Sequence, residues 1–478
     1  MRMHFNISQI IYTLGLFAVC FAVSLYDSQN PLTKIYARGD TSVYQYIGKM
    51  MWQGILPYRD IFDHKGPVVY LWNMLGYGLH PMTGQWLLEF LLLLGSAFIA
   101  FKIAHKYLSE LTSFIITSIV ILFTPYEDTI GNTENISVFL NFAFLYYDLK
   151  LQSRPKTISF VLGFILALQL LIKPPHSILP IIFCTGTFLN LLIKKNYLLL
   201  KTFTFYTALG FISVTACFLL ALEAYGGLTN FYHDYLLFNL QYTPYWKQTY
   251  SLKFITDFYL TEPIIKLQLI LLVISALLCF KPNTPLHLLN CLNTITAIST
   301  IYLIIMPNNP LKHYTYMLSP ILFTSLVLFC HSFNKYRASI LVIITTIFIY
   351  GICQTTSHLT NNSPKEQNDV VTDTAIFLQN NLKEKEPFIV LGYDMCRLHL
   401  LTNRPFTTHY PMNPMVNRIM PQKLFTELKQ AKPKFILLRV EEISHYKNSF
   451  YTYWPEFSNE YPLIKQNSEY YIFMRINP

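Results

Sequence analysis

Charged residues are scarce in this sequence. They form 13% of its 478 residues, against roughly a quarter in an ordinary soluble domain. Hydrophobic residues form 53% of the chain, a share that favours an integral membrane protein. The net charge is +10, but the basic residues form no long run and no RNA-binding motif is present. We therefore expect membrane lipids, and no nucleic acid, as partners.

Cysteines at metal-binding or redox spacings are also lacking. The eight cysteines include no CxxC pair and no Cys/His metal pattern. All but Cys396 lie inside apolar stretches, where cysteine behaves as a small hydrophobic residue. We expect neither disulfides nor structural zinc. The sequence also lacks an internal repeat, which argues against a transporter because many transporters are duplicated.

Long apolar segments, by contrast, fill the chain up to residue 357. They predict about eleven membrane-spanning helices, at residues 8–26, 84–101, 111–125, 135–147, 157–172, 176–193, 202–225, 263–280, 286–306, 314–333 and 338–357. The first segment could instead be a signal peptide, since Ala22-Val23-Ser24 faintly resembles a cleavage site. Its length and a leader that carries only Arg2 favour a retained helix.

The charges in the turns agree with this count. If the N-terminus is cytoplasmic, the cytoplasmic turns hold clusters of Lys and Arg and the opposite turns hold acids, as the positive-inside tendency requires. Residues 68–79 are too short to cross, so we predict a juxtamembrane or re-entrant helix there. The first and second external loops are then 27–83 and 126–135. In a Gram-negative cell they lie on the periplasmic side of the inner membrane.

The composition changes at residue 358, where hydrophobic runs shorten and charges become more frequent. Strands are expected at 388–391, 435–440 and 470–474, and helices at 369–382 and 422–431. We predict a transmembrane domain over 1–357 and a small soluble α/β domain over 358–478. The topology places this second domain outside the cytoplasm.

The first external loop carries the densest set of charged groups. Val43, Ile47 and Met50 recur at helical spacing, with Ser42, Gln45 and Lys49 on the other side. That pattern predicts a short amphipathic helix lying flat on the membrane with its apolar face down. Gly54 and Pro57 end it, and a turn of Asp63, His64, Lys65, Gly66 and Pro67 follows.

This loop resembles a known family. An acid soon after the first helix, followed by GKMMWQGILPYRDIFDHKGPVVYLWNMLG, is similar to the GT-C membrane glycosyltransferases, in particular the family of protein mannosyltransferases and the aminoarabinose transferase acting on lipid A. LHLLTNRPFTTHYP, at residues 398–411, also resembles the tail domain of bacterial members. The resemblance implies a polytopic helical fold with juxtamembrane helices in the first loop and an external C-terminal domain.

The resemblance also implies an activity, the transfer of a hexose or pentose from a polyprenyl phosphate to a lipid A, glycan or protein acceptor. A carboxylate takes the proton of the acceptor hydroxyl as it attacks the anomeric carbon, a contribution on the order of 10²–10⁴ in rate. Fixed cations favour the departing lipid phosphate. No nucleophilic Ser or Cys constellation is present, which fits direct inversion. No cofactor is certain, although a divalent cation stays open.

Within the first loop, the resemblance assigns the general base to Asp40, although Asp also suits a helix N-cap. Similar enzymes have a Lys-Pro pair whose lysine meets the donor phosphate. Here Gly66 separates Lys65 from Pro67, and a snorkelling lysine is the alternative. Weaker substrate-binding candidates, which could equally be solvated loop residues, are Arg59, Asp63 and His64. One histidine with scattered acids is a poor metal signature, so no metal ligand is assigned.

The remaining candidates lie at other external helix ends. The second loop, TPYEDTIGNTEN, supplies Glu127 and Asp128 as a second catalytic acid or as ordinary loop charge, and Glu134 as a substrate contact or helix cap. Further candidates for gripping phosphate, or for anchoring at the interface, are Lys173 before two prolines, His313 and Tyr314.

Two other function classes remain open. A different surface-polysaccharide polymerase or ligase would also use prenyl-linked sugars, but we expect it to centre on Arg- and His-rich external loops. A lipid-linked sugar transporter or flippase predicts ionisable residues inside the spans. Here the acids cluster in loops, with Glu89 and Glu223 as the exceptions.

Overall fold

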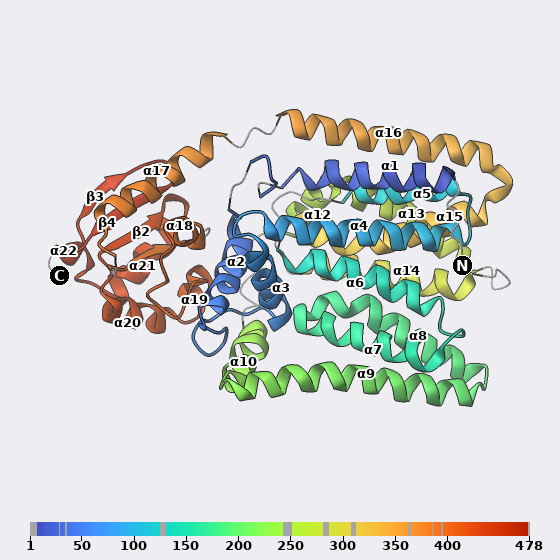
Figure 1. Cartoon of the computed structure of the whole chain (residues 1–478), viewed down its shortest axis with the longest axis horizontal. Helices are drawn as coiled ribbons and strands as arrows, with labels where there is room; N and C mark the ends of the chain where they lie inside the picture. The colour runs from blue at the N-terminus through green and yellow to red at the C-terminus, as the bar shows by residue number, and fades with distance from the viewer. Residues whose placement is uncertain are drawn as a thin grey trace.

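The computed structural model describes residues 7–27, 29–33, 36–124, 131–241, 251–280, 286–306, 312–361, 365–384, 386–392 and 395–476, with side chains described at these positions except 252, 358–361, 365–369 and 395. Long helices lie side by side in a bundle, and a small α/β domain caps one end of it (Figure 1). α1 begins at the opposite end from this C-terminal domain.

Each predicted spanning segment falls on a helix of the bundle. These helices are α1 (Ile7–Ser24), α4 (Gly84–His105), α5 (Glu110–Leu122), α6 (Thr133–Asp148), α7 (Pro155–Ile172), α8 (Ile178–Ile193), α9 (Tyr197–Ala224), α13 (Pro263–Cys279), α14 (His287–Ile305), α15 (Ser319–Ser332) and α16 (Arg337–Asn361). Eight helical segments among the described residues are long and apolar enough to cross a membrane. A helix pair, α12 (Leu252–Thr261) and α13, is bent by 97° and would add a ninth. The count of eleven stays a prediction, since α5 has only 13 residues.

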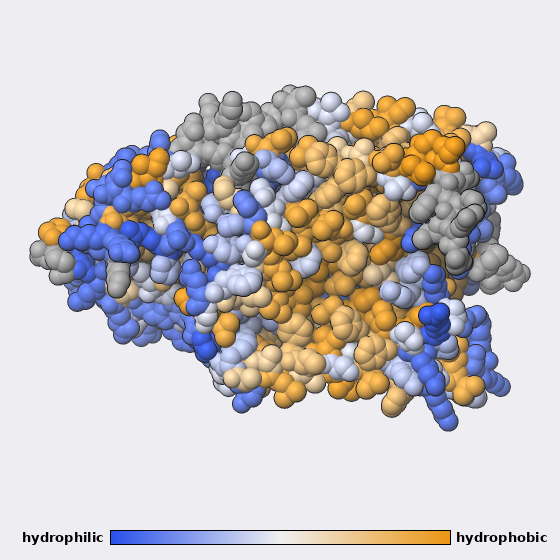
Figure 2. Space-filling view, in the orientation of Figure 1, coloured by the Kyte–Doolittle hydropathy of each residue, from blue (hydrophilic) through white to orange (hydrophobic). Residues whose placement is uncertain are grey.

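The surface agrees with a membrane-embedded bundle. Hydrophobic residues cover the long helices in a continuous band, and hydrophilic residues gather at both ends and over the C-terminal domain (Figure 2). Phe17 of α1 and Leu198 and Ile212 of α9 are among the exposed large hydrophobic side chains. Exposed apolar side chains at this density are stable where lipid tails surround them.

Short helices fill the space between the bundle and the C-terminal domain. They include α2 (Gly39–Trp52), α3 (Pro67–Leu79), α10 (Leu228–Phe231) and the π-helical turn η2 (Tyr232–Leu237) (Figure 1). The 3₁₀ turns η1 (Pro174–Ser177) and η3 (Lys312–Leu318) begin α8 and α15, and a further 3₁₀ turn, η4 (Asn334–Tyr336), precedes α16. The non-spanning helix predicted at 68–79 is therefore confirmed as α3.

α2 does not turn an apolar face to lipid and a polar face to water, as the sequence predicted, because protein covers both faces. Every residue from Thr41 to Met50 is buried, because α3 packs on one side of the helix and α18 (Met395–Thr402) of the C-terminal domain on the other. Lys49, predicted to face water, is only 2% exposed. The polar face of α2 is thus covered by protein.

The C-terminal domain has a four-stranded sheet in the order β1-β2-β4-β3. β1 (Phe388–Leu391) and β2 (Phe435–Arg439) are parallel, and β4 (Tyr470–Met474) pairs antiparallel with β2 and with β3 (Leu463–Gln466). The surrounding helices are α17 (Lys365–Asn381), α18, α19 (Asn413–Ile419), α20 (Pro421–Ala431), η5 (Val440–Glu442), α21 (Ile443–Tyr453) and α22 (Phe457–Glu460). The three predicted strands are present. β3 was missed because all four of its residues are exposed, so it lacks an apolar face.

Two hydrophobic cores divide the molecule, and their boundary does not follow the chain. One core joins the bundle helices. The other joins the strands of the C-terminal domain to the first loop, including Val43, Tyr44 and Phe62. Although the first loop lies between α1 and α4 in the sequence, most of its apolar side chains are buried with the C-terminal domain.

Candidate active site

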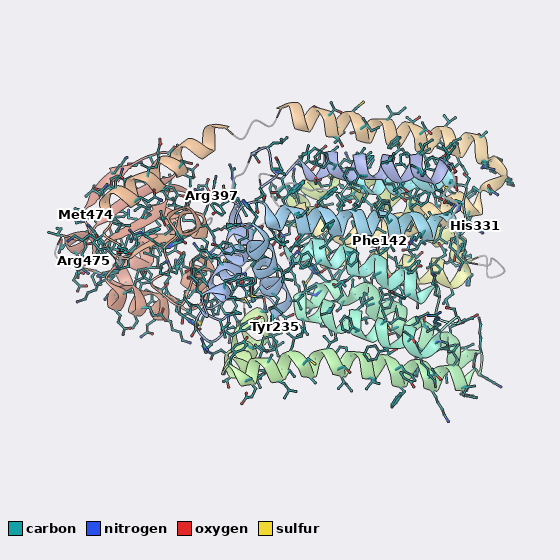
Figure 3. The ribbon with its side chains drawn as sticks, viewed as in Figure 1. Phe142, Tyr235, His331, Arg397, Met474 and Arg475 are labelled. Atoms are coloured by element: carbon teal, nitrogen blue, oxygen red, sulfur yellow. The ribbon has the colours of Figure 1, made fainter. Side chains whose placement is uncertain are left out.

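Five segments that are far apart in the sequence bring charged side chains to the end of the bundle beneath the C-terminal domain. They are the first turn of α2, the loop before α3, the first turn of α6, the junction of α7 with η1, and the first residues of η3. Tyr235 of η2 lies at this end, and His331 of α15 lies at the opposite end (Figure 3). The convergence puts most of the predicted site residues in one region.

Asp63, His64 and Lys65 form a chain of close polar contacts. Lys65 Nζ lies 2.6 Å from His64 Nε2, and His64 Nδ1 lies 3.2 Å from Asp63 Oδ1. An ammonium group only donates, so Nε2 accepts and the imidazole proton resides on Nδ1, facing the carboxylate. Asp63 is held in turn by the Tyr70 hydroxyl, which donates to Oδ2 at 2.8 Å. The lysine ammonium is therefore oriented by a buried, neutral histidine.

Burial sets the protonation of this chain. It lowers the pKa of His64, and the charge of Lys65 lowers it further, so the ring stays neutral. Burial also lowers the pKa of Lys65, although the negative charges of Asp40 and Asp63 oppose the shift. Burial alone would raise the pKa of Asp63, but hydrogen bonding and charge from His64 bring it below its ordinary value.

Gly66 explains why this turn departs from a simple Lys-Pro pair. Its backbone N–H donates to the Ile172 carbonyl at 3.1 Å. A Cβ placed on Gly66 would overlap the carbonyl oxygen of Leu171. Only a residue without a side chain allows the loop to approach the end of α7 this closely. The contact brings Lys65 to the segment that carries Lys173.

A second group of charged side chains, around Glu134, lies at the same end of the bundle. Glu134 Oε1, fully buried, accepts from Lys173 Nζ at 3.0 Å and lies 3.4 Å from His176 Nε2. The Lys173 ammonium also lies 4.3 Å from the centre of the Tyr314 ring. The His313 ring contacts the Tyr314 ring in a T-shaped arrangement, with 4.7 Å between the ring centres. Burial lowers the pKa of Lys173, but Glu134 more than compensates and the pKa rises above its ordinary value.

Asp40 lies in the first turn of α2 and is half-buried. Arg38 is the N-cap, so Asp40 is not the capping residue that the sequence allowed. Among the described contacts, its carboxylate accepts a long hydrogen bond of 3.4 Å from the Tyr44 hydroxyl. Its charge acts on Lys65, Lys173 and His313. Asp40 is therefore an accessible carboxylate near two lysines.

Glu127 and Asp128 of the second loop lie outside the described residues. The loop is described again from Gly131, whose N–H donates to Glu89 Oε1 at 3.2 Å and whose carbonyl accepts from Asn73 Nδ2 at 2.8 Å. A Cβ on Gly131 would lie 3.2 Å from Thr41 Cγ2. The end of the second loop is thus pinned against the residue next to Asp40.

Arg59 stands apart from the predicted site. Its side chain is exposed and pairs with the neighbouring Asp60; it also donates to the Gly54 carbonyl. The pairing lowers the pKa of Asp60. Arg59 braces its own loop and does not join the cluster.

A metal centre is not formed by the described residues. No group of three or more His, Cys, Asp or Glu side chains in these ranges is arranged to hold an ion. The cluster pairs its acids with lysines, which compete with a metal for the same oxygens.

Several residues of this region were missed from the sequence. Tyr44 contacts Asp40 and Tyr70 contacts Asp63, and His176 contacts Glu134. Asn239 Nδ2 donates to the His64 carbonyl at 2.7 Å. His176 could have been found from its position three residues after Lys173. The tyrosines carried no such signal, because aromatic residues are abundant throughout the chain. Asn239 carried no such signal either.

No protein-family model and no characterised protein sequence matches this chain. Solved structures do. ArnT from Cupriavidus metallidurans matches in the apo state with a TM-score of 0.66, and bound to undecaprenyl phosphate with a TM-score of 0.65. Identity is 12% in both, over 97% and 98% of each chain respectively. The chain has the GT-C fold.

A second match supports this fold. The oligosaccharyltransferase AglB from Archaeoglobus fulgidus, in complex with an inhibitory peptide and a dolichol-phosphate, matches with a TM-score of 0.55 at 10% identity, over 95% of this chain and 73% of AglB. The ArnT matches cover 97% and 98% of this chain, so the likeness includes its C-terminal domain.

Proposed function

We propose that this protein is a membrane glycosyltransferase that moves a sugar from a polyprenyl phosphate to an acceptor, with inversion, at the external face of the bacterial inner membrane. The observation that carries the proposal is the unequal state of the acids in the cluster. Asp63 and Glu134 are fully buried and engaged by His64 and Lys173. Asp40 is half-exposed, contacts a tyrosine at long range and lies in the field of both lysines.

In this mechanism Asp40 is the general base. The acceptor oxygen attacks the anomeric carbon, the bond from that carbon to the phosphate oxygen breaks, and its electron pair leaves with the lipid phosphate. The proton of the acceptor hydroxyl passes to the Asp40 carboxylate. A positioned base of this kind contributes on the order of 10²–10⁴ in rate.

Lys65 acts on the phosphate. His64 accepts one hydrogen bond from the Lys65 ammonium. Because His64 is neutral and not an anion, it leaves the positive charge of Lys65 in place. Among the described residues, no further hydrogen bond of the Lys65 ammonium is found, so two of its N–H groups and its positive charge can stabilise the leaving group. Lys173 is paired with Glu134, and we assign Lys173, His313 and Tyr314 to the wall of the same site. Glu127 and Asp128 remain candidates for binding the acceptor.

The fold of both neighbours supports the proposal, since ArnT was solved with undecaprenyl phosphate and AglB with a dolichol-phosphate. The topology argument supports an external site, because the acid-bearing end of the bundle carries the C-terminal domain and the lysine-rich turns lie at the other end. The acceptor class is left to experiment among lipid A, a glycan and a protein.

The test has two parts. Mass spectrometry of envelope lipids, glycans and proteins from cells with and without this protein should reveal one modification that depends on it. The purified protein should then transfer that sugar from its polyprenyl phosphate to the identified acceptor, and undecaprenyl phosphate should inhibit the reaction. An unchanged envelope together with no binding of undecaprenyl phosphate would reject the proposal.

A further inference from the structure

The loop at residues 58–66, which carries Asp63, His64 and Lys65, has almost no regular structure. Apart from one isolated bridge between Pro57 and Ile61, it forms neither helix nor strand. Ordering each residue of such a loop costs about 1–2 kcal/mol of backbone entropy. Its buried polar backbone groups also need partners. The partners that the structure provides reveal what holds the loop in place.

Alternate residues of this loop are anchored through their backbones by different elements. On one side, Asn230 donates to the Tyr58 carbonyl at 2.7 Å and Asn239 to the His64 carbonyl at 2.7 Å. At the end of the loop, Gly66 N–H bonds to the end of α7. These three anchors come from the transmembrane part of the chain.

Two further anchors hold Asp60 and Phe62, and both come from one residue of the C-terminal domain, His409. Its Nδ1 lies 2.8 Å from the Asp60 carbonyl, so it donates that hydrogen bond. Its own carbonyl accepts the Phe62 N–H at 2.7 Å. Glu427 of α20 holds His409 in turn, since its carboxylate accepts the His409 N–H at 2.7 Å. His409 therefore grips the loop three residues before Lys65.

Aromatic contacts add to this grip. The Phe62 ring packs against Tyr410 of the C-terminal domain at 5.4 Å and against Phe238 at 4.9 Å. Deeper in the interface, the Phe406 N–H donates to the Tyr46 hydroxyl of α2 at 2.6 Å. The C-terminal domain thus contacts both parts of the first loop that carry proposed site residues.

We infer that the C-terminal domain is a positioning element for the phosphate-binding lysine, and that His409 is its principal positioning residue. The inference rests on the proposed function, since it assigns the domain to the donor side of the reaction. His409 touches the loop backbone and not the site. Losing its side chain releases the Asp60 carbonyl, loosens residues 60–65 and lowers the fraction of molecules in which Lys65 is placed for phosphate.

The test compares four full-length variants with the wild type. His409→Ala removes the bond to Asp60, and His409→Asn restores a side-chain N–H donor at that place. Tyr46→Phe removes the acceptor of the Phe406 N–H. His445→Ala is the matched control, because His445 is an exposed histidine on α21 of the same domain. Thermal unfolding of each variant verifies that the protein stays folded.

Two readouts are needed, the affinity for undecaprenyl phosphate and the amide hydrogen exchange of residues 58–66. We expect His409→Ala and Tyr46→Phe each to weaken binding by about threefold to tenfold, the effect of one lost hydrogen bond. His409→Ala should also speed exchange at Phe62. His409→Asn should recover most of both, and His445→Ala should change neither.

The outcomes separate this inference from the proposed function. A wild-type protein that does not bind undecaprenyl phosphate contradicts the proposed function and, with it, the donor role of the domain; the exchange data still decide whether His409 holds the loop. A wild type that binds, with His409→Ala equal to it in affinity and exchange, overturns the inference alone. Reduced sugar transfer with unchanged affinity and exchange would also overturn it, by placing the domain on the acceptor side.

Discussion

Two carboxylate–lysine groups lie at the same end of the bundle, and they are in opposite states. In one, Lys173 is paired directly with buried Glu134, and the pKa of the lysine is raised. In the other, Lys65 contacts a neutral histidine and Asp40 stays apart from it, and the pKa of the lysine is lowered. The first group neutralises itself. The second keeps a partly exposed acid, Asp40, and a lysine whose ammonium contacts a histidine in place of a carboxylate, which is why we propose that the second group reacts.

The difference arises from what each acid contacts. Glu134 lies in the first turn of a helix that packs against η3 and α7, where its carboxylate has no access to water. An ion in such a place is stable only with a partner. Asp40 also lies in the first turn of a helix, next to Thr41 that approaches Gly131, but it is partly exposed. Two acids in similar helix positions thus differ in exposure and in partners, and this difference is the basis on which we propose different roles for them.

The largest expected effect separates the two acids. Asp40→Asn should lower the rate of sugar transfer by about 10²–10⁴, because the amide cannot accept the proton. Undecaprenyl phosphate affinity and the melting temperature should stay close to those of the wild type. Steady-state kinetics on purified protein measure the change. Transfer within threefold of the wild type would show that another group is the base.

The next effect concerns stability. Lys173→Ala leaves Glu134 as a buried carboxylate without its lysine, and breaking a buried pair costs about 3–5 kcal/mol. We expect a clearly lowered melting temperature. The double variant Lys173→Met with Glu134→Gln should regain most of it, because the buried charge is gone. If the double variant is as unstable as the single one, the pair does not carry the stability assigned to it.

Lys65→Ala should show the reverse pattern, with a smaller energy. A hydrogen bond to a charged group contributes about 1.5–3 kcal/mol, so affinity for undecaprenyl phosphate should fall by about 10- to 100-fold. The melting temperature should hold or rise, because a buried ammonium is removed. A large loss of stability with unchanged lipid affinity would make Lys65 a structural residue like Lys173.

The pH dependence sharpens the contrast between the lysines. Because burial lowers the pKa of Lys65, its charge is present at lower pH and is lost as pH rises through that lowered pKa. The affinity for an anionic lipid phosphate should therefore fall with rising pH, and the fall should come at a lower pH than it would for a lysine with an ordinary pKa. In Lys65→Arg the fall should move to higher pH, since arginine stays charged. Binding curves with the same alkaline limb in both proteins would contradict this.

The smallest effect is expected at Arg59. It is exposed and pairs with Asp60 at the surface, and such pairs contribute little. Arg59→Ala should change undecaprenyl phosphate affinity and sugar transfer by less than about twofold. A change of tenfold or more would return Arg59 to the substrate-binding residues that the sequence suggested.

Part of this site could be predicted from the sequence because its residue types stand out locally. Asp40, Lys65, Lys173 and His313 are polar residues at the ends of apolar segments, and the topology puts those ends on one side. The state of each residue could not be predicted. Whether Lys65 meets a carboxylate or a histidine depends on side-chain directions in a loop without regular structure. The role of Gly66 required knowledge that α7 ends against it.

The fold divides in the same way. Hydropathy and charge determined the helices of the bundle, their alternation and the change of character near residue 358, because each follows from residues close together in the chain. The burial of α2, and the sharing of a core between the first loop and the C-terminal domain, were decided only by tertiary structure. Contacts such as Phe62 with His409 join residues hundreds of positions apart. No local pattern records such a contact, because its stability comes from surfaces that meet only after folding.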